Sequence, residues 1–126
     1  MAFRNLNGKK YPIPGFDTAL YTNWPNARWH IVDSIFEIWE DDDGNPCPTW
    51  EEIQEVVNEQ SEIYGYFAYE RDREKEYPEL KDQLDMLFKD ITSGKLEDGE
   101  WYQTIKSIKD KHPKPEDPTP DLSKYN

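Results

Sequence analysis

The chain has 126 residues, which suits one domain with a single modest core. Its 15 Lys and Arg residues stand against 27 Asp and Glu residues, so the net charge is −12. A surface this acidic repels phosphate backbones and anionic lipid headgroups, so we expect no nucleic acid and no membrane among its partners, and proteins instead. Aromatic residues make up 14% of the chain, and their large area favours a folded domain over disorder.

Residues 1–48 are predicted to form a β-rich N-terminal part. The stretch 17–23 fits one short strand. The stretches 27–33 and 34–40 alternate in polarity and are rich in Trp, Ile, Val and Phe, which is typical of strands. We expect these two to pair as an antiparallel hairpin, with part of the second face covered by a helix or a partner.

Residues 49–112 predict three helices, at 49–76, 78–93 and 100–112, which we expect to form one domain with residues 1–48. The first opens with a Thr-x-x-Glu capping box and carries apolar residues at three- and four-residue spacing. The second starts at a proline, and the third ends in basic residues that suit the negative end of a helix dipole.

The second and third helices are predicted to pack as a helical hairpin. The apolar residues of the second helix share one face: Leu80, Leu84, Leu87, Phe88 and Ile91. We expect Leu84 and Leu87 to face the third helix, because a helix this short is marginal in water without packing.

Residues 113–126 contain four prolines and almost no apolar residues, so we expect a flexible tail in which Leu122 and Tyr125 are small anchors for a partner. The predicted fold class is α+β. A small N-terminal antiparallel β-hairpin or meander leads into a long helix, a C-terminal helical hairpin and a disordered proline-rich tail.

The sequence carries no recognisable catalytic or cofactor motif. It has no P-loop, no GxGxxG and no HExxH, and neither His30 nor His112 lies at a catalytic spacing from a Ser or Cys. The acidic loop 40–48 lacks the ligands that an EF-hand needs at its first and last positions. We therefore expect no enzymatic activity, no cofactor and no metal.

The sequence shows no pattern typical of a membrane span or a secretory signal. No run approaches the roughly 20 apolar residues of a membrane span, and the first ten residues lack the apolar stretch of a secretory signal. The lone Cys47 has no partner for an internal disulfide. These features predict a protein made in a reducing cytoplasm.

Three aromatic residues are predicted to contribute to an interface. Trp24 lies in the loop-like TNWPN, and Tyr66 and Tyr69 lie off the main apolar stripe of the first predicted helix. Trp and Tyr are enriched among the residues that dominate binding energy. The alternative for each is simple packing in the core.

Two segments together resemble a known group of viral proteins. YPELKDQLDMLFKDI, followed by IKSIKDKHPKP, is similar to the pattern YPxxxDQLDxL…IKxxKxxxPKP of small proteins of tailed bacteriophages, especially those infecting cyanobacteria. The upstream RWHIVDSIFEIWEDDDGNPCPTWEEIQ also looks like the strand segment that precedes this module. The resemblance covers most of residues 27–115 and implies a component of the virion tail or tail-fibre region.

This resemblance implies a non-enzymatic virion structural protein, an adaptor or decoration subunit that docks on tail, fibre or neck proteins and is located in the virion. One alternative is a tail-fibre assembly chaperone that is absent from the particle. Another is an acidic host-takeover inhibitor that mimics DNA, against which we note Lys and Arg mixed with the acids along the predicted helices. Self-association is left open.

Overall fold

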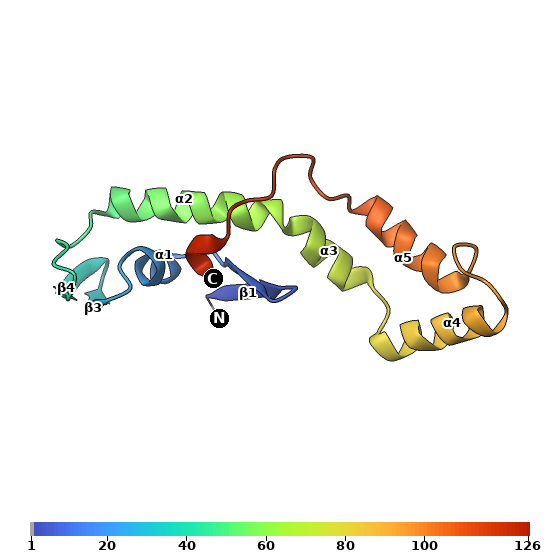
Figure 1. Ribbon diagram of the computed structural model, residues 1–126. Helices are drawn as coiled ribbons and strands as arrows, with labels where there is room; N and C mark the ends of the chain where they lie inside the picture. The colour runs from blue at the N-terminus through green and yellow to red at the C-terminus, as the bar shows by residue number, and fades with distance from the viewer. Residues whose placement is uncertain (1) are drawn as a thin grey trace. The chain divides into compact units, whose positions relative to one another are not determined.

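The structure is a computed structural model that describes residues 2–126. The chain divides into two compact units, one built from residues 2–66 together with 119–126, and the other from residues 67–118. Figure 1 shows the helices and strands along the chain. The mixed composition confirms the predicted α+β class.

The first unit begins with a two-stranded antiparallel sheet. Strand β1 (Phe3–Leu6) pairs with β2 (Lys9–Pro12) across a two-residue turn. The turn residues Asn7 and Gly8 have φ of 52° and 81°. Asn and Gly are the residues that tolerate positive φ, and such turns match the natural twist of paired strands.

The predicted hairpin in the middle of the first unit is confirmed. Strand β3 (Ala27–Val32) pairs antiparallel with β4 (Ile35–Asp41), and the two turn residues have positive φ. One face of the hairpin is apolar, and Trp29 and Trp39 on it lie opposite each other and pack against the core. The alternation of half-buried and exposed residues along β3 is what its sequence predicts.

The prediction of a strand over 17–23 is wrong, because this stretch forms helix α1 (Phe16–Asn23). Ala19 and Leu20 are adjacent in the sequence, and both are fully buried. A strand would turn one of them to solvent, whereas a helix can direct both toward the long helix α2 (Trp50–Tyr66), on which α1 packs. The burial of both residues against α2 therefore favours a helix over a strand for residues 16–23.

Helix α2 supplies the other half of this core. Its Ile53 and Val56 are buried and cluster with Ala19 and Leu20 of α1. The helix begins as predicted, since the Thr49 hydroxyl accepts the N–H of Glu52 at 3.1 Å. Further along α2, the fully buried amide of Gln60 donates to the hydroxyl of Thr22 at 3.0 Å.

The prediction of a flexible tail over 113–126 must be corrected for its last eight residues. Residues 119–126 belong to the first unit, and Ser123–Tyr125 forms the short 3-10 helix η1 beside β2. The side-chain amide of Asn126 accepts the N–H of Lys10 at 2.7 Å and donates to its C=O at 2.9 Å. It thereby satisfies the outer edge of β2 much as another strand would, and composition alone does not reveal such an edge.

The second unit consists of helices α3 (Ala68–Glu76), α4 (Leu80–Thr92) and α5 (Glu100–Lys111). The predicted helix over 49–76 is interrupted at the buried Phe67, which separates α2 from α3. The division between the units falls there, inside the region that we expected to form one domain. The nearby Gly65 weakens helix propensity by about 1 kcal/mol relative to Ala, which favours a break at this place.

Candidate docking surface

Helix α4 has well-defined ends. It follows Pro78, which fits the start of a helix, and it stops at Ser93 and Gly94, whose φ is 71°. After this stop, the N–H of Lys95 reaches back to the C=O of Asp90 at 2.8 Å, and the N–H of Gly94 bonds to the C=O of Ile91 at 3.0 Å. These two bonds form a Schellman motif, so the end of α4 is fixed locally.

One side of α4 is attached to α5 by polar contacts. Asp90 is buried, and its Oδ2 accepts the backbone N–H of Trp101 at 2.9 Å. The Trp101 indole N–H donates to Gln83 Oε1 at 3.3 Å, and Gln83 also donates to the C=O of Pro78 at 2.8 Å. Asp90 therefore caps α5 from outside that helix, a role that Gly99 at the cap position has no side chain to perform.

Close packing explains why a glycine precedes α5. A Cβ atom added to Gly99 would lie 2.5 Å from Oδ2 of Asp90. No side chain at position 99 is compatible with the observed place of the capping carboxylate. The Asp90–Gly99 contact therefore fixes how α5 begins against α4.

The opposite end of α5 is attached to α3. Arg73 donates through Nε to the C=O of His112 at 2.8 Å and through Nη2 to the C=O of Lys109 at 3.3 Å. Glu76 bonds to Lys111 at 2.5 Å and to the His112 ring. The bond from Lys111, with a smaller effect of His112, holds the pKa of the Glu76 carboxyl below its ordinary value.

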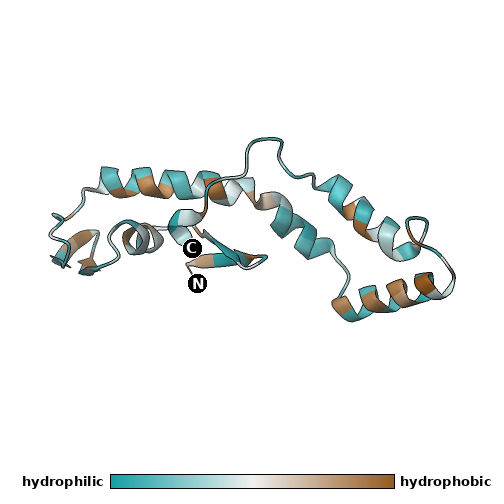
Figure 2. Cartoon of the chain, viewed as in Figure 1, coloured by the Kyte–Doolittle hydropathy of each residue, from teal (hydrophilic) through white to brown (hydrophobic). Residues whose placement is uncertain are grey.

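The remaining side of α4 exposes large apolar residues. Four side chains at helical spacing form what we call the α4 stripe: Leu80, 71% exposed, Leu84, 57%, Phe88, 69%, and Ile91, 60%. Figure 2 shows the hydrophobic bands that recur along α4. The expectation that Leu84 faces α5 is wrong, because α5 is met by the side of α4 that carries Gln83 and Asp90.

The charges beside the α4 stripe are paired with one another. Lys89 lies 3.1 Å from Asp85 one turn away, and Lys81 lies 3.6 Å from Glu79. All four side chains are exposed, so each pair contributes little stability. Their effect is to leave the rim of the stripe close to neutral in an otherwise acidic chain. Such an apolar surface with a balanced polar rim is characteristic of a protein-binding site.

The predicted interface residue Trp24 lies at the edge of the core. Its ring is half-buried, packs against the core cluster and meets Trp39 edge to face, with ring centroids 6.3 Å apart. Its backbone N–H closes helix α1 by bonding to the C=O of Leu20. The structure thus gives Trp24 a packing role and leaves part of its ring accessible.

The other predicted residues are also half-buried. Three belong to the place where the C-terminal segment docks: the Tyr66 hydroxyl bonds to Thr119 at 3.2 Å, Leu122 precedes η1, and the Tyr125 ring lies 6.3 Å from that of Phe3. Burial raises the pKa of Tyr125, and a hydrogen bond with Gln60 partly opposes this.

Tyr69 belongs to the second unit. Its ring lies beneath the guanidinium of Arg73, with the Arg73 Cζ atom 4.9 Å from the ring centroid. This contact supports the arginine that joins α3 to α5. The five predicted residues therefore take part in different contacts, and the sequence did not single out the α4 stripe as an exposed site.

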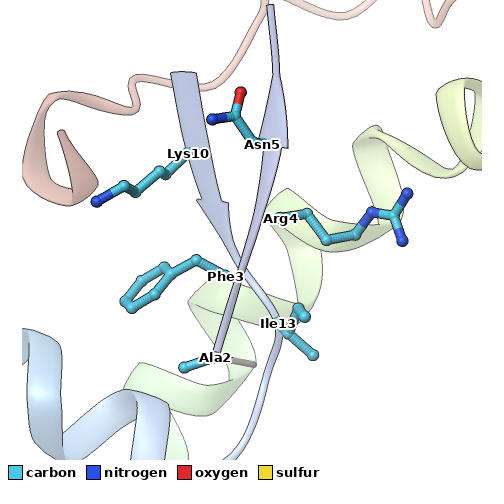
Figure 3. Close-up of a pocket in the computed structure, with 6 residues that line it drawn as sticks. All are labelled: Ala2, Phe3, Arg4, Asn5, Lys10 and Ile13. Carbon is cyan, nitrogen blue, oxygen red and sulfur yellow. The ribbon is translucent and has the colours of Figure 1, made fainter. Parts of the chain in front are cut away.

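One hollow in the described part of the chain lies on the β1–β2 hairpin. It is open, has a volume of about 690 Å³, and is lined by Ala2, Phe3, Arg4, Asn5, Lys10 and Ile13. Figure 3 shows Phe3 and Lys10 pointing from one face of the hairpin and Arg4 from the other. The lining holds no pair of acid and base groups that suggests a reaction.

Within residues 2–126, no group of three or more His, Cys, Asp or Glu side chains is arranged to hold a metal ion. Among the same residues, no helix is both long enough and apolar enough to cross a bilayer.

Comparisons of the chain with models of protein families, with curated proteins and with solved structures find no match in any of the three.

Proposed function

We propose that the chain is a non-enzymatic structural subunit of a bacteriophage virion, an adaptor or decoration protein of the tail or tail-fibre region that acts by protein–protein docking. The observation that carries the docking role is the α4 stripe, four large apolar side chains that the described residues leave more than half exposed. Exposed apolar area of this kind is disfavoured in a free subunit and stabilising once a partner covers it. The viral assignment is supported by the motif resemblance of residues 77–115.

Mass spectrometry of purified phage particles tests this proposal. We expect the chain in the particle at a fixed stoichiometry with the tail proteins. In a phage that encodes the double substitution Leu84→Glu and Phe88→Glu, we expect the chain to be made but lost from the particle. The substitution Ile35→Glu is the matched control, because Ile35 is comparably exposed at 65% but lies on β4, and it leaves incorporation intact.

The absence of the wild-type chain from particles contradicts a structural role. Two results together would favour the assembly-chaperone alternative over our proposal. The chain is absent from wild-type particles, and a phage that cannot make the chain fails to assemble its fibres.

A specific observation favours the acidic inhibitor as second candidate. Between Arg28 and Arg71 the sequence has no Lys or Arg. Helix α2 therefore carries acidic side chains and no basic ones. Its five glutamates are all exposed: Glu51, Glu52, Glu55, Glu59 and Glu62. The expectation that basic residues are mixed along every helix is therefore wrong for α2. Competition between the chain and duplex DNA for a basic host protein, abolished by Glu55→Lys with Glu59→Lys, is the outcome that would support this candidate.

A further inference from the structure

We infer that the partner that covers the α4 stripe is a second copy of this chain, paired antiparallel through α4. The inference rests on the proposed docking role of the stripe and names its occupant. It follows from the incomplete core of the α4–α5 hairpin, from the symmetry of the stripe, from its area and from the local charge.

The α4–α5 hairpin contains no fully buried apolar residue, so its own core is incomplete. Within α4 the only buried residue is the capping Asp90, and α5 has none. Both helices are nevertheless amphipathic, and helices of 13 and 12 residues are marginal without packing of their apolar faces. Two helical hairpins that meet face to face form a four-helix bundle, which is the common way for such a pair to complete its core.

The α4 stripe is complementary to itself. A twofold interface requires that each residue meets its counterpart in the reversed direction. The stripe consists of an outer pair, Leu80 and Ile91, and an inner pair, Leu84 and Phe88. The midpoint of each pair along the helix lies at residues 85–86. In an antiparallel pair, Leu80 of one copy therefore lies over Ile91 of the other, and Leu84 lies over Phe88.

The exposed area is sufficient for a symmetric pair. From the exposed fractions, the four side chains present about 500 Å² of mostly apolar surface. Two copies would cover about 1,000 Å², which is the lower limit for a specific interface. We therefore expect a dimer of moderate affinity.

The charge distribution allows two acidic chains to approach at this surface. Residues 67–118 contain 10 Lys and Arg against 14 Asp and Glu, a net charge of −4, whereas the remaining residues have 5 against 13, a net charge of −8. The stripe lies in the less acidic unit, and its nearest charges are already paired as Asp85 with Lys89 and Lys81 with Glu79. Repulsion between copies is thus weakest where the apolar area is greatest.

Sedimentation equilibrium of the full chain tests the inference. We expect a reversible monomer–dimer equilibrium in the wild-type chain, and at least a roughly 30-fold higher dissociation constant for Leu84→Glu and for Phe88→Glu, because both side chains lie near the centre of the interface. Ile35→Glu is the control and leaves the constant unchanged. A wild-type chain that stays monomeric at high micromolar concentration overturns the inference, as does a dimer that neither stripe substitution weakens.

A distance measurement gives a second readout that needs no destabilising substitution. Spin labels on Asp85→Cys in a Cys47→Ser background lie near the twofold axis, so the labels of two copies should be about 20 Å apart or closer, given helix separations of 8–10 Å. A longer distance excludes the antiparallel pairing. The particle experiment remains independent of the dimer. A chain that is monomeric but incorporated into particles refutes the dimer and keeps the proposed function. A chain that dimerises but is absent from particles keeps the dimer and refutes the proposed function.

Discussion

Removal of the Asp90 carboxylate should loosen the start of α5, because this buried group caps that helix from α4. Asp90 Oδ2 accepts the N–H of Trp101 at 2.9 Å, and the residue is only 7% exposed. Loss of a capping side chain costs about 1 kcal/mol, and loss of a negative charge at a helix N-terminus costs about 0.3–1 kcal/mol more. For Asp90→Ala we therefore expect a loss of about 1–2 kcal/mol in the free energy of opening at this end of α5.

Amide hydrogen exchange of Trp101 measures this loss directly, because its N–H is the donor in the capping bond. A loss of 1–2 kcal/mol corresponds to exchange faster by roughly 5- to 30-fold. Asp90→Asn keeps an acceptor and loses the charge, so we expect a smaller acceleration of about twofold. Asp85→Ala is the matched control, since Asp85 is an exposed acid on the same helix and takes no part in the cap.

The two Asp90 substitutions separate the cap from general packing. If Asp90→Ala accelerates Trp101 exchange no more than Asp85→Ala does, the capping argument is wrong. If Asp90→Asn and Asp90→Ala are equally damaging, the charge of the carboxylate and not its acceptor geometry carries the effect.

Three further predictions concern the C-terminal segment and the α3–α5 contact. Asn126→Ala should accelerate exchange of the Lys10 amide several-fold, since it removes both bonds to β2, and unchanged exchange would show that the segment is held otherwise. Because the pKa of Tyr125 is raised in the folded chain, the stability it contributes is present below pH 10 and is lost as pH rises beyond that value. NMR contacts between Tyr125 and its neighbours should then disappear above pH 10, and Tyr125→Phe should remove this dependence. The pKa of Glu76 is lowered instead, so its contribution is present above pH 4.5 and is lost as pH falls below it. The protection of the Lys111 amide, relative to its intrinsic exchange rate at each pH, should therefore fall below pH 4.5, and an equal fall in Glu76→Gln would refute this cause.

Local patterns in the sequence predicted much of the secondary structure. Alternation was sufficient for the β3–β4 hairpin, because each strand has one face against the core and one toward solvent. Three- and four-residue spacing, bounded by Pro78 and Gly94, was sufficient for α4 within two residues at each end. The same spacing identified every residue of the α4 stripe, although it assigned the stripe to the interior.

The sequence could not predict which side of α4 meets α5. That choice depends on Asp90 and Gln83, two polar residues that bond to Trp101 across the hairpin. A pattern of hydrophobic residues predicts that the apolar side of a helix is the side in contact with its neighbour. It therefore predicted that the apolar side of α4 contacts α5. The sequence therefore identified which residues share the apolar face of α4, but it did not predict that this face is exposed.

By itself, the sequence determined where the chain turns, where its strands alternate and which residues share a helix face, because these depend on neighbours a few positions away. Only the tertiary structure decided that residues 16–23 are helical, that the helix after Thr49 stops at Tyr66, and that residues 119–126 return to β2. The first and the last of these depend on a partner far along the chain, because α1 packs on α2 and residues 119–126 pack on β2. The Asn126–Lys10 contact spans 116 positions, and no local pattern encodes so distant a pairing.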